Sequence, residues 1–154
     1  MSRRIFISYQ HRDQMKAKGF NLMSHADNID VSFVGRHLLD PIDSTNGDYI
    51  RSKVREQLSG TSVTVVLLGH DSAESAWVDW EIEESLRKGN GLLGIRLEDG
   101  ADVPLTLTTC GAEILDWFRP EDVHEFSDAI ERAATGARRA PLLVAAASKS
   151  SCSR

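Results

Sequence analysis

The chain has 154 residues, of which 41% are hydrophobic and 27% charged, and its formal net charge is −5. These values are typical of one globular domain with a substantial core, and a negative charge without a basic face argues against nucleic acid as a partner. We expect neither a membrane helix nor a signal peptide, and Cys110 and Cys152 form no C-x-x-C pair, so a reducing cytoplasm and no membrane partner are predicted.

Strand-like and helix-like patterns alternate along the chain. Short apolar runs predict strands at residues 4–8, 31–34, 61–68, 92–97 and 112–116. Amphipathic periodicity predicts helices that end near residue 24, that span 48–59 and 72–88, and that run from Pro120 to Gly136. The intervals 35–47 and 98–110 are rich in turn-forming residues, and we expect loops there. Residues 137–154 are expected to be a poorly ordered or weakly docked tail outside a domain of residues 1–136.

The alternation of strand and helix predicts an α/β fold of the flavodoxin-like type. Such a fold has three layers, with a parallel sheet of about five strands in the order 2-1-3-4-5 and helices on both faces. Ligands of these sheets bind outside the carboxyl ends of the strands, near the switch point between strands one and three. The residues that follow those two strands are Ser8, Tyr9 and Gln10 on one side and Gly69, His70 and Asp71 on the other.

The helix predicted at 72–88 carries the main functional clue. Its apolar stripe consists of Val78, Ile82 and Leu86. Glu83 and Glu84 are predicted to project away from this stripe. Glu81 falls inside the buried arc, between Trp77 and Ser85. A carboxylate on the buried side of a helix that leaves the end of a central strand could serve a reaction. It could equally hydrogen-bond a neighbouring backbone group or pair with an arginine.

Several other motifs are given structural interpretations. Residues 89–94 (GNGLLG) match G-x-G-x-x-G, but the order helix, glycines, strand is the reverse of a dinucleotide-binding turn, so a helix end is predicted. A receiver-type phosphoacceptor would need an acidic residue where Leu68 stands. The five histidines have no metal-ligand spacing, no metal site is predicted, and only His70 is placed near the expected cleft. Trp77 and Trp80 are interpreted as packing residues rather than a stacking platform.

Two segments resemble TIR domains. Residues 4–9 (RIFISY) resemble the first strand of these domains, and residues 61–68 followed by 75–82 (SAWVDWEI) resemble their third strand and the S-x-W-[CV]-x-x-E-[IL] helix. The continuation through residue 95 is most similar to the TIR-like proteins of the bacterial Thoeris antiphage system. The resemblance covers about residues 3–135. The 35–47 loop departs from it, because it lacks the R-D-x-x-P-G pattern of the second TIR box.

The resemblance implies a function and a set of site residues. In that family the glutamate of the helix motif, here Glu81, is the catalytic residue that cleaves NAD at the nicotinamide–ribose bond. NAD is then a substrate, and no cofactor is expected. The implied product is an ADP-ribose-derived, often cyclic, signal that activates a separate effector during infection, which implies a phage-derived trigger and permits a homo-oligomer. The residues expected to line the substrate site are Phe6, Ser8, Tyr9, His70 and Trp77.

A single carboxylate suits this chemistry. Glycosidases generally use two, since the leaving sugar oxygen must be protonated. Nicotinamide leaves from a pyridinium that is already positive, so one anion beside the ribose can stabilise the developing cation. Two alternatives stay open: a TIR-like interaction module without catalysis, and another flavodoxin-like enzyme of C–N glycosidic chemistry, such as a nucleoside deoxyribosyltransferase.

Overall fold

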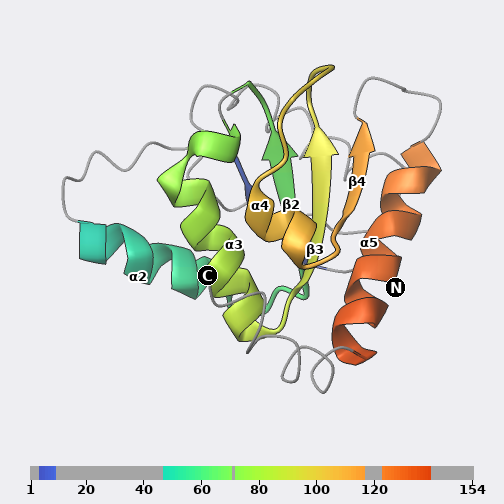
Figure 1. The fold of residues 1–154 in the computed structure, drawn as a ribbon. Coiled ribbons are helices and arrows are strands. Elements are labelled where there is room, and N and C mark those ends of the chain that lie inside the picture. The colour runs from blue at the N-terminus through green and yellow to red at the C-terminus, as the bar shows by residue number, and fades with distance from the viewer. Residues whose placement is uncertain (1–3, 10–46, 71, 117–122, 140–154) are drawn as a thin grey trace.

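Figure 1 shows a computed structural model of the chain, which describes residues 4–9, 47–70, 72–116 and 123–139. The described part contains a parallel sheet in the order β1-β2-β3-β4. The strands are β1 (Ile5–Ser8), β2 (Val63–Leu68), β3 (Gly91–Arg96) and β4 (Glu113–Asp116). They are the first, third, fourth and fifth predicted strands in the predicted order, so the α/β flavodoxin-like fold class is confirmed. The predicted strand at 31–34 and the helix ending near residue 24 lie outside the described residues.

Helices cover both faces of the sheet, and its two central strands are almost entirely buried. All six residues of β2 are buried, as expected for a parallel strand between two layers of helices. Side chains of alternating residues enter different cores: Ile5 and Ile7 pack with residues of the helix α5 (Val123–Arg139), whereas Phe6 packs with residues of the helix α2 (Gly47–Leu58). This two-residue period is the pleat of the strand.

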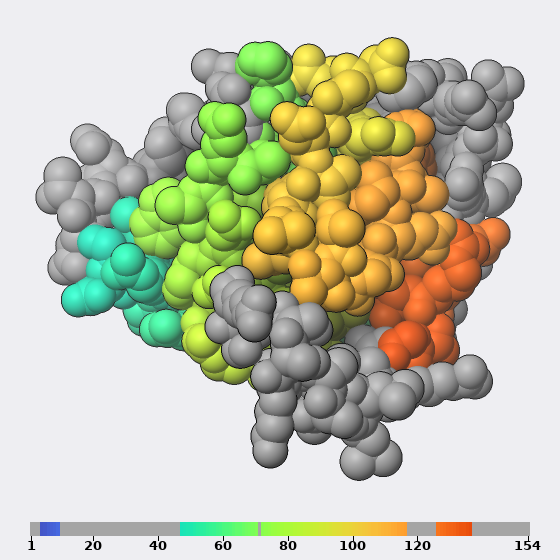
Figure 2. All heavy atoms as spheres, viewed as in Figure 1, coloured from blue at the N-terminus to red at the C-terminus, as the bar shows by residue number. Residues whose placement is uncertain are grey.

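The helices opposite α5 share one face of the sheet. They are α2, α3 (Ala76–Lys88) and the short α4 (Leu105–Thr109), with a 3-10 turn, η2 (Ser72–Glu74), before α3. Val66 and Leu68 of β2 pack with residues of α3 and α4 in one apolar cluster. In Figure 2 the atoms of α2, α3 and α4 form one continuous surface over this face.

Three sequence predictions about boundaries were wrong. The helix predicted at 72–88 begins as an α-helix only at Ala76, after the 3-10 turn Ser72–Glu74. The interval 98–110 contains the helix α4 rather than a continuous loop, because Pro104 supplies a helix-compatible φ of −55° at its start and Leu107 becomes fully buried against α3. The last helix does not stop at Gly136 but continues to Arg139. A glycine costs a helix only about 1 kcal/mol, which is too little to end it. Residues 140–154, most of the predicted tail, lie outside the described part.

The glycines of residues 89–94 have the structural roles that the sequence order predicts. Gly89 ends α3 in the left-handed region (φ 92°), where its amide hydrogen-bonds the carbonyl of Leu86 and the amide of Asn90 reaches that of Ser85. At Gly91 a Cβ atom would lie 2.1 Å from the carbonyl oxygen of Ala133, so α5 crosses β3 at a distance that only glycine allows. The segment is therefore a helix end followed by a close packing contact.

Candidate functional site at the carboxyl edge of the sheet

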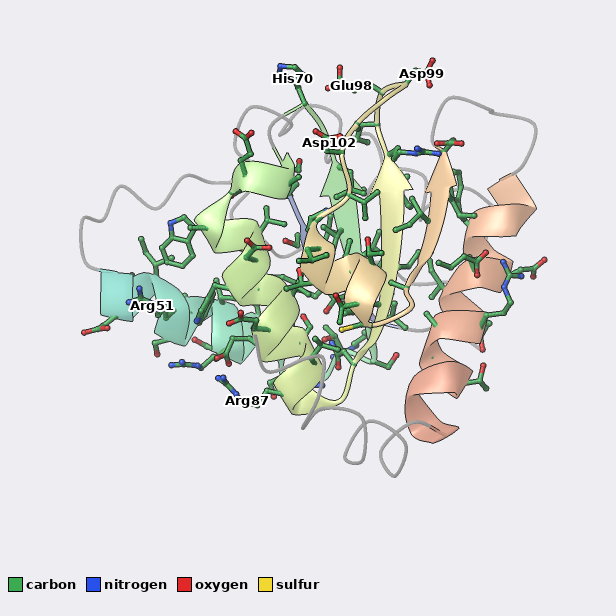
Figure 3. All side chains as sticks on the ribbon, in the orientation of Figure 1. Arg51, His70, Arg87, Glu98, Asp99 and Asp102 are labelled. Carbon is green, nitrogen blue, oxygen red and sulfur yellow. The ribbon has the colours of Figure 1, made fainter. Side chains whose placement is uncertain are left out.

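The predicted site residues come from three elements that meet at or near the carboxyl edge of the sheet. β1 ends at Ser8, β2 ends at Leu68 and is followed by His70, and α3 begins near the same edge and runs back along the sheet. Figure 3 shows His70 at this edge with three acidic residues of the segment after β3, namely Glu98, Asp99 and Asp102. The carboxyl ends of β1 and β2 and the first turns of α3 therefore define the candidate site.

The helix α3 is fixed at both ends by short-range interactions. The Ser75 side chain accepts a hydrogen bond from the amide of Val78 (3.3 Å), which satisfies one of the unpaired amides of the first turn. At the other end, the amides of Gly89 and Asn90 satisfy carbonyls of the last turn. Both ends are encoded within a few residues of the helix. The caps therefore fix the residues between which α3, the helix that carries Glu81, is formed.

Glu81 is buried, as the helical periodicity predicts. Its residue surface is 1% exposed, and its Oε2 atom receives no hydrogen bond among the described residues. Desolvation of a carboxylate is costly, so a buried one needs compensating interactions. Tyr9 lies close enough to Glu81 for the Glu81 charge to oppose the ionisation of its phenol.

Tyr9 follows β1 directly and is 6% exposed. Burial, and secondly the negative charge of Glu81, raise the pKa of the Tyr9 phenol to about 12. Both causes disfavour the phenolate: the first because a buried anion loses its hydration, the second because two anions repel. Tyr9 therefore stays a neutral phenol near neutral pH, and its hydroxyl remains able to donate a hydrogen bond beside Glu81.

Ser8 and Phe6 lie on the same strand with different surroundings. Ser8 is fully buried, and its Oγ atom has no hydrogen-bond partner among the described residues. An unsatisfied buried hydroxyl costs about 1–3 kcal/mol, which makes Ser8 a candidate for a contact with a bound molecule. Phe6 is also fully buried, and it packs in a core cluster with Val54 and Leu58 of α2. The structure thus places Phe6 in the core beneath the site.

His70 and Trp77 are the more exposed members of the predicted set. His70 is exposed at the carboxyl edge, next to the end of β2. Trp77 is 40% exposed, and its ring meets that of Trp80 edge-on at a centroid distance of 5.6 Å. The Arg51 guanidinium of α2 lies 5.6 Å from the Trp77 ring centroid. Trp77 therefore joins α3 to α2, in keeping with its interpretation as a packing residue.

The sequence did not predict the burial of Glu84. Its side chain does not project into solvent but is 9% exposed, and it forms ion pairs with Arg55 of α2 (3.2 Å) and with Arg87. The helical periodicity of α3 could not indicate this burial, because the residues that cover Glu84 belong to α2. Arg55, for example, is 29 residues away from Glu84 in the sequence. Nearby is an open pocket of about 270 Å³, which is lined by Arg55, Leu58, Ser59, Glu84, Arg87 and Lys88. None of the predicted site residues lines it.

Sequence reasoning also missed a group of buried polar side chains between β2 and α3. Thr64 and Ser85 are both fully buried, and their hydroxyl oxygens lie 2.6 Å apart. Asn90 is 5% exposed and donates to Thr64 (3.2 Å). The signal that could have found them is the presence of polar residues at positions where the periodicity predicts burial, since such groups need partners.

The described part of the chain contains neither a cluster suited to a metal ion nor a helix suited to a bilayer. Residues 4–9, 47–70, 72–116 and 123–139 hold no group of three or more His, Cys, Asp or Glu side chains that could bind a metal. Within the same ranges, none of the helices combines the length and apolar character needed to cross a membrane.

The fold and the edge residues define an α/β protein with a parallel sheet and a buried carboxylate near the carboxyl ends of its strands. A sequence model of the family described as "Thoeris protein ThsB, TIR-like domain" matches residues 6–102, more than half of the chain. The chain belongs to this family of Thoeris ThsB TIR-like proteins.

One curated relative and one solved structure illustrate the similarity. The "Putative cyclic ADP-D-ribose synthase ThsB1" of Bacillus cereus (strain MSX-D12) is 28% identical over 122 residues, which are 77% of this chain and 64% of that protein. The chain thus spans somewhat less than two thirds of the length of this relative. The 2-desoxiribosyltransferase from Leishmania mexicana superimposes with a TM-score of 0.47 and 18% identity, over 71% of this chain and 72% of that one.

Proposed function

We propose that this protein cleaves NAD at the nicotinamide–ribose bond and forms an ADP-ribose-derived signal, linear or cyclic, that activates a separate effector in antiphage defence. Support comes chiefly from Glu81, a carboxylate that is 1% exposed in the helix motif of the family and lies beside the end of β1. The name of the Bacillus cereus relative, "Putative cyclic ADP-D-ribose synthase ThsB1", gives a product of the class proposed here.

The residues at the edge suit a reaction with a cationic transition state. In the proposed step the C1′–N bond of NAD breaks, its electron pair stays on the nicotinamide nitrogen, and the pyridinium leaves as a neutral pyridine. Glu81 holds a ribose hydroxyl and stabilises the positive charge that develops at the ribose. Water then attacks C1′ and releases a proton to give ADP-ribose, or an adenine nitrogen of the same molecule attacks to give a cyclic product. Neither route needs a general acid on the leaving group.

Tyr9 and Ser8 have complementary parts in this proposal. Because the pKa of Tyr9 is about 12, its hydroxyl is protonated near neutral pH and adds no second negative charge next to Glu81. The Ser8 hydroxyl lacks a hydrogen-bond partner in the described part, and it is proposed to hydrogen-bond the ribose or the nicotinamide amide. His70, which is exposed at the carboxyl edge, and Trp77, which is exposed in the first turn of α3, are proposed to bound the outer side of the site.

The test is nicotinamide release from NAD by the purified full chain, alone and with extracts of phage-infected and uninfected cells, followed by mass spectrometry. We expect Glu81→Gln to lower the rate at least a hundredfold, equivalent to about 3 kcal/mol of transition-state stabilisation. Glu83→Gln is the matched control, because Glu83 is exposed on the same helix and loses the same charge. It should retain the wild-type rate.

Three results would contradict the proposal. Intact NAD in every sample that contains folded protein would leave a non-catalytic interaction module, and partner binding should then survive Glu81→Gln. Consumption of nucleosides instead of NAD would indicate deoxyribosyl-type transfer. Equal losses of rate in Glu81→Gln and Glu83→Gln would show that charge on α3, and not the buried carboxylate, matters.

A further inference from the structure

A polar network, buried except for the exposed Lys88, links α3 to the sheet within one to two helical turns of Glu81. Its members are Thr61, Thr64, Ser85, Lys88 and Asn90. The Ser85 hydroxyl lies 2.7 Å from the backbone carbonyl oxygen of Glu81 and 2.6 Å from the hydroxyl of Thr64 in β2. Ser85 therefore connects the peptide group of Glu81 itself to the central strand.

The hydrogen bonds of the network can have only one direction. Ser85 has a single hydroxyl proton, which it donates to the carbonyl of Glu81, so Thr64 must donate its own proton to Ser85. Asn90 then donates to Thr64 (3.2 Å) through its amide nitrogen. At the far end the Lys88 ammonium donates to the amide oxygen of Asn90 (3.0 Å). The amide nitrogen of Asn90 also donates to the Thr61 hydroxyl (3.0 Å), and the Lys88 ammonium also donates to the Thr61 carbonyl (2.6 Å). These further bonds hold Asn90 in the orientation that directs a donor at Thr64, so the network favours a single arrangement of side chains.

The network also determines the position of Glu81 along the direction of the strands. Thr64 is in register with Phe6 of β1, and α3 runs antiparallel to the strands because it leaves the end of β2 and leads to the start of β3. From Ser85 to Glu81 is one helical turn, about 6 Å towards the carboxyl edge. From Phe6 to Ser8 and Tyr9 is two to three strand residues, roughly 7–10 Å in the same direction. The bond between Ser85 and Thr64 thus brings Glu81 level with the end of β1.

We infer that Ser85, held by Thr64, is a positioning residue for Glu81 in the NAD cleavage proposed above. A serine that bonds the carbonyl four residues earlier gives a helix no net stability and competes with its regular hydrogen bonds. Here that bond is made to the peptide of Glu81, and a second one ties the same hydroxyl to the sheet. Loss of the hydroxyl frees the turn of α3 that carries the carboxylate. A small displacement of a reacting group can cost up to a hundredfold in rate.

The experiment uses two readouts, the kcat for nicotinamide release and the pKa of Tyr9. Tyr9 reports on Glu81 without any turnover, because the nearby carboxylate raises the pKa of its phenol. In a Tyr49→Phe background Tyr9 is the only tyrosine, and its phenolate is followed by ultraviolet absorbance after a rapid jump to alkaline pH. The variants are Ser85→Ala, Thr64→Val and Thr64→Ser, each also combined with Glu81→Gln.

We expect Ser85→Ala and Thr64→Val to lower kcat between about tenfold and about a hundredfold with little change in KM. Both should also lower the pKa of Tyr9, and Thr64→Ser, which keeps the hydroxyl, should restore both values. In the Glu81→Gln background neither change should alter the Tyr9 pKa further. Thr135→Ala is the control, because Thr135 donates the same kind of bond, to the carbonyl of Glu131, on the exposed side of α5.

The outcomes separate this inference from the proposed function. If folded Ser85→Ala and Thr64→Val keep both the wild-type kcat and the wild-type Tyr9 pKa, Ser85 does not position Glu81. An equal fall of the Tyr9 pKa with and without the Glu81 carboxylate would show a general structural change and also overturn the inference. If the wild-type chain never cleaves NAD but the Tyr9 shift depends on Glu81 as expected, the positioning by Ser85 stands and the proposed function fails.

Discussion

Replacing Gly91 with alanine gives the sharpest test of how the sheet supports the site. Gly91 begins β3, next to the polar network, and a Cβ there would lie 2.1 Å from the carbonyl oxygen and 2.5 Å from the carbonyl carbon of Ala133. Ordinary contact begins at 3.4 Å, so α5 would have to withdraw by 3.4 − 2.1 = 1.3 Å. The atoms that the Cβ would meet belong to the backbone of Ala133 and cannot rotate out of the way as a side chain could.

The cost follows from the apolar interface that such a withdrawal opens. Ala129 and Ile130 of α5 are fully buried in one cluster with Leu93 and Ile95 of β3. A gap of 0.5–1 Å already loses a quarter to a half of a dispersion contact, and overpacking typically costs about 1–3 kcal/mol. We therefore expect Gly91→Ala to destabilise the protein by about 3 kcal/mol and to lower the Tm by roughly 6–12 °C.

Chemical and thermal denaturation measure the loss of stability in Gly91→Ala, and alanine substitutions at two other glycines serve as comparisons. Gly136 lies within α5, and a Cβ added there would meet nothing within 4 Å, so Gly136→Ala should stabilise the chain by up to about 1 kcal/mol. At Gly94 the nearest atom is the end of the Ile114 side chain (2.6 Å), which can move, so Gly94→Ala should fall between the two. A Gly91→Ala variant within about 0.5 kcal/mol of wild type would refute the close approach of α5 and β3.

Three further predictions concern the site and the helix that carries Glu81. Because the pKa of Tyr9 is raised to about 12 in the folded state, its stabilising contribution is complete below its unfolded pKa of about 10 and is lost as pH rises to 12. Denaturation between pH 10 and 12 should show a loss of roughly 2–3 kcal/mol in wild type that Tyr9→Phe lacks; parallel pH curves would contradict it. Glu84→Gln should cost about 1 kcal/mol by loss of the pairs with Arg55 and Arg87, and the difference should shrink at high salt; a salt-independent difference would contradict this. Ser75→Ala removes the N-cap of α3 and should cost about 1 kcal/mol in urea denaturation, whereas Ser75→Asp should not.

Much of the sheet could be predicted from the sequence because its signals are local. The apolar runs at 61–68 and 92–97 coincide with β2 and β3 to within two residues at either end. The end of α3 at Gly89 follows from a glycine in the left-handed region, and the burial of Glu81 follows from the angle between its side chain and the apolar stripe. Each of these depends on residues within one or two turns of the chain.

Predictions failed where a distant segment covers a residue. Glu84 lies outside the apolar stripe of α3, yet α2 packs over it and supplies Arg55 as its partner. The helix α4 forms in an interval of turn-like composition because Leu107 finds an apolar cluster made by β2 and α3. Neither partner lies near these residues in the sequence, so local periodicity could not indicate them.

The sequence by itself determined which strands are buried on both faces, where α3 ends, and that the Glu81 side chain turns inward. It could do so because backbone periodicity and capping are properties of neighbouring residues. Only the tertiary structure decided that Glu81 lies beside Tyr9 and that Ser85 bonds Thr64, since these contacts depend on the register between α3 and strands whose residues are 21 or more positions away. The candidate site is thus encoded locally in its parts and assembled by the packing of α3 on the sheet.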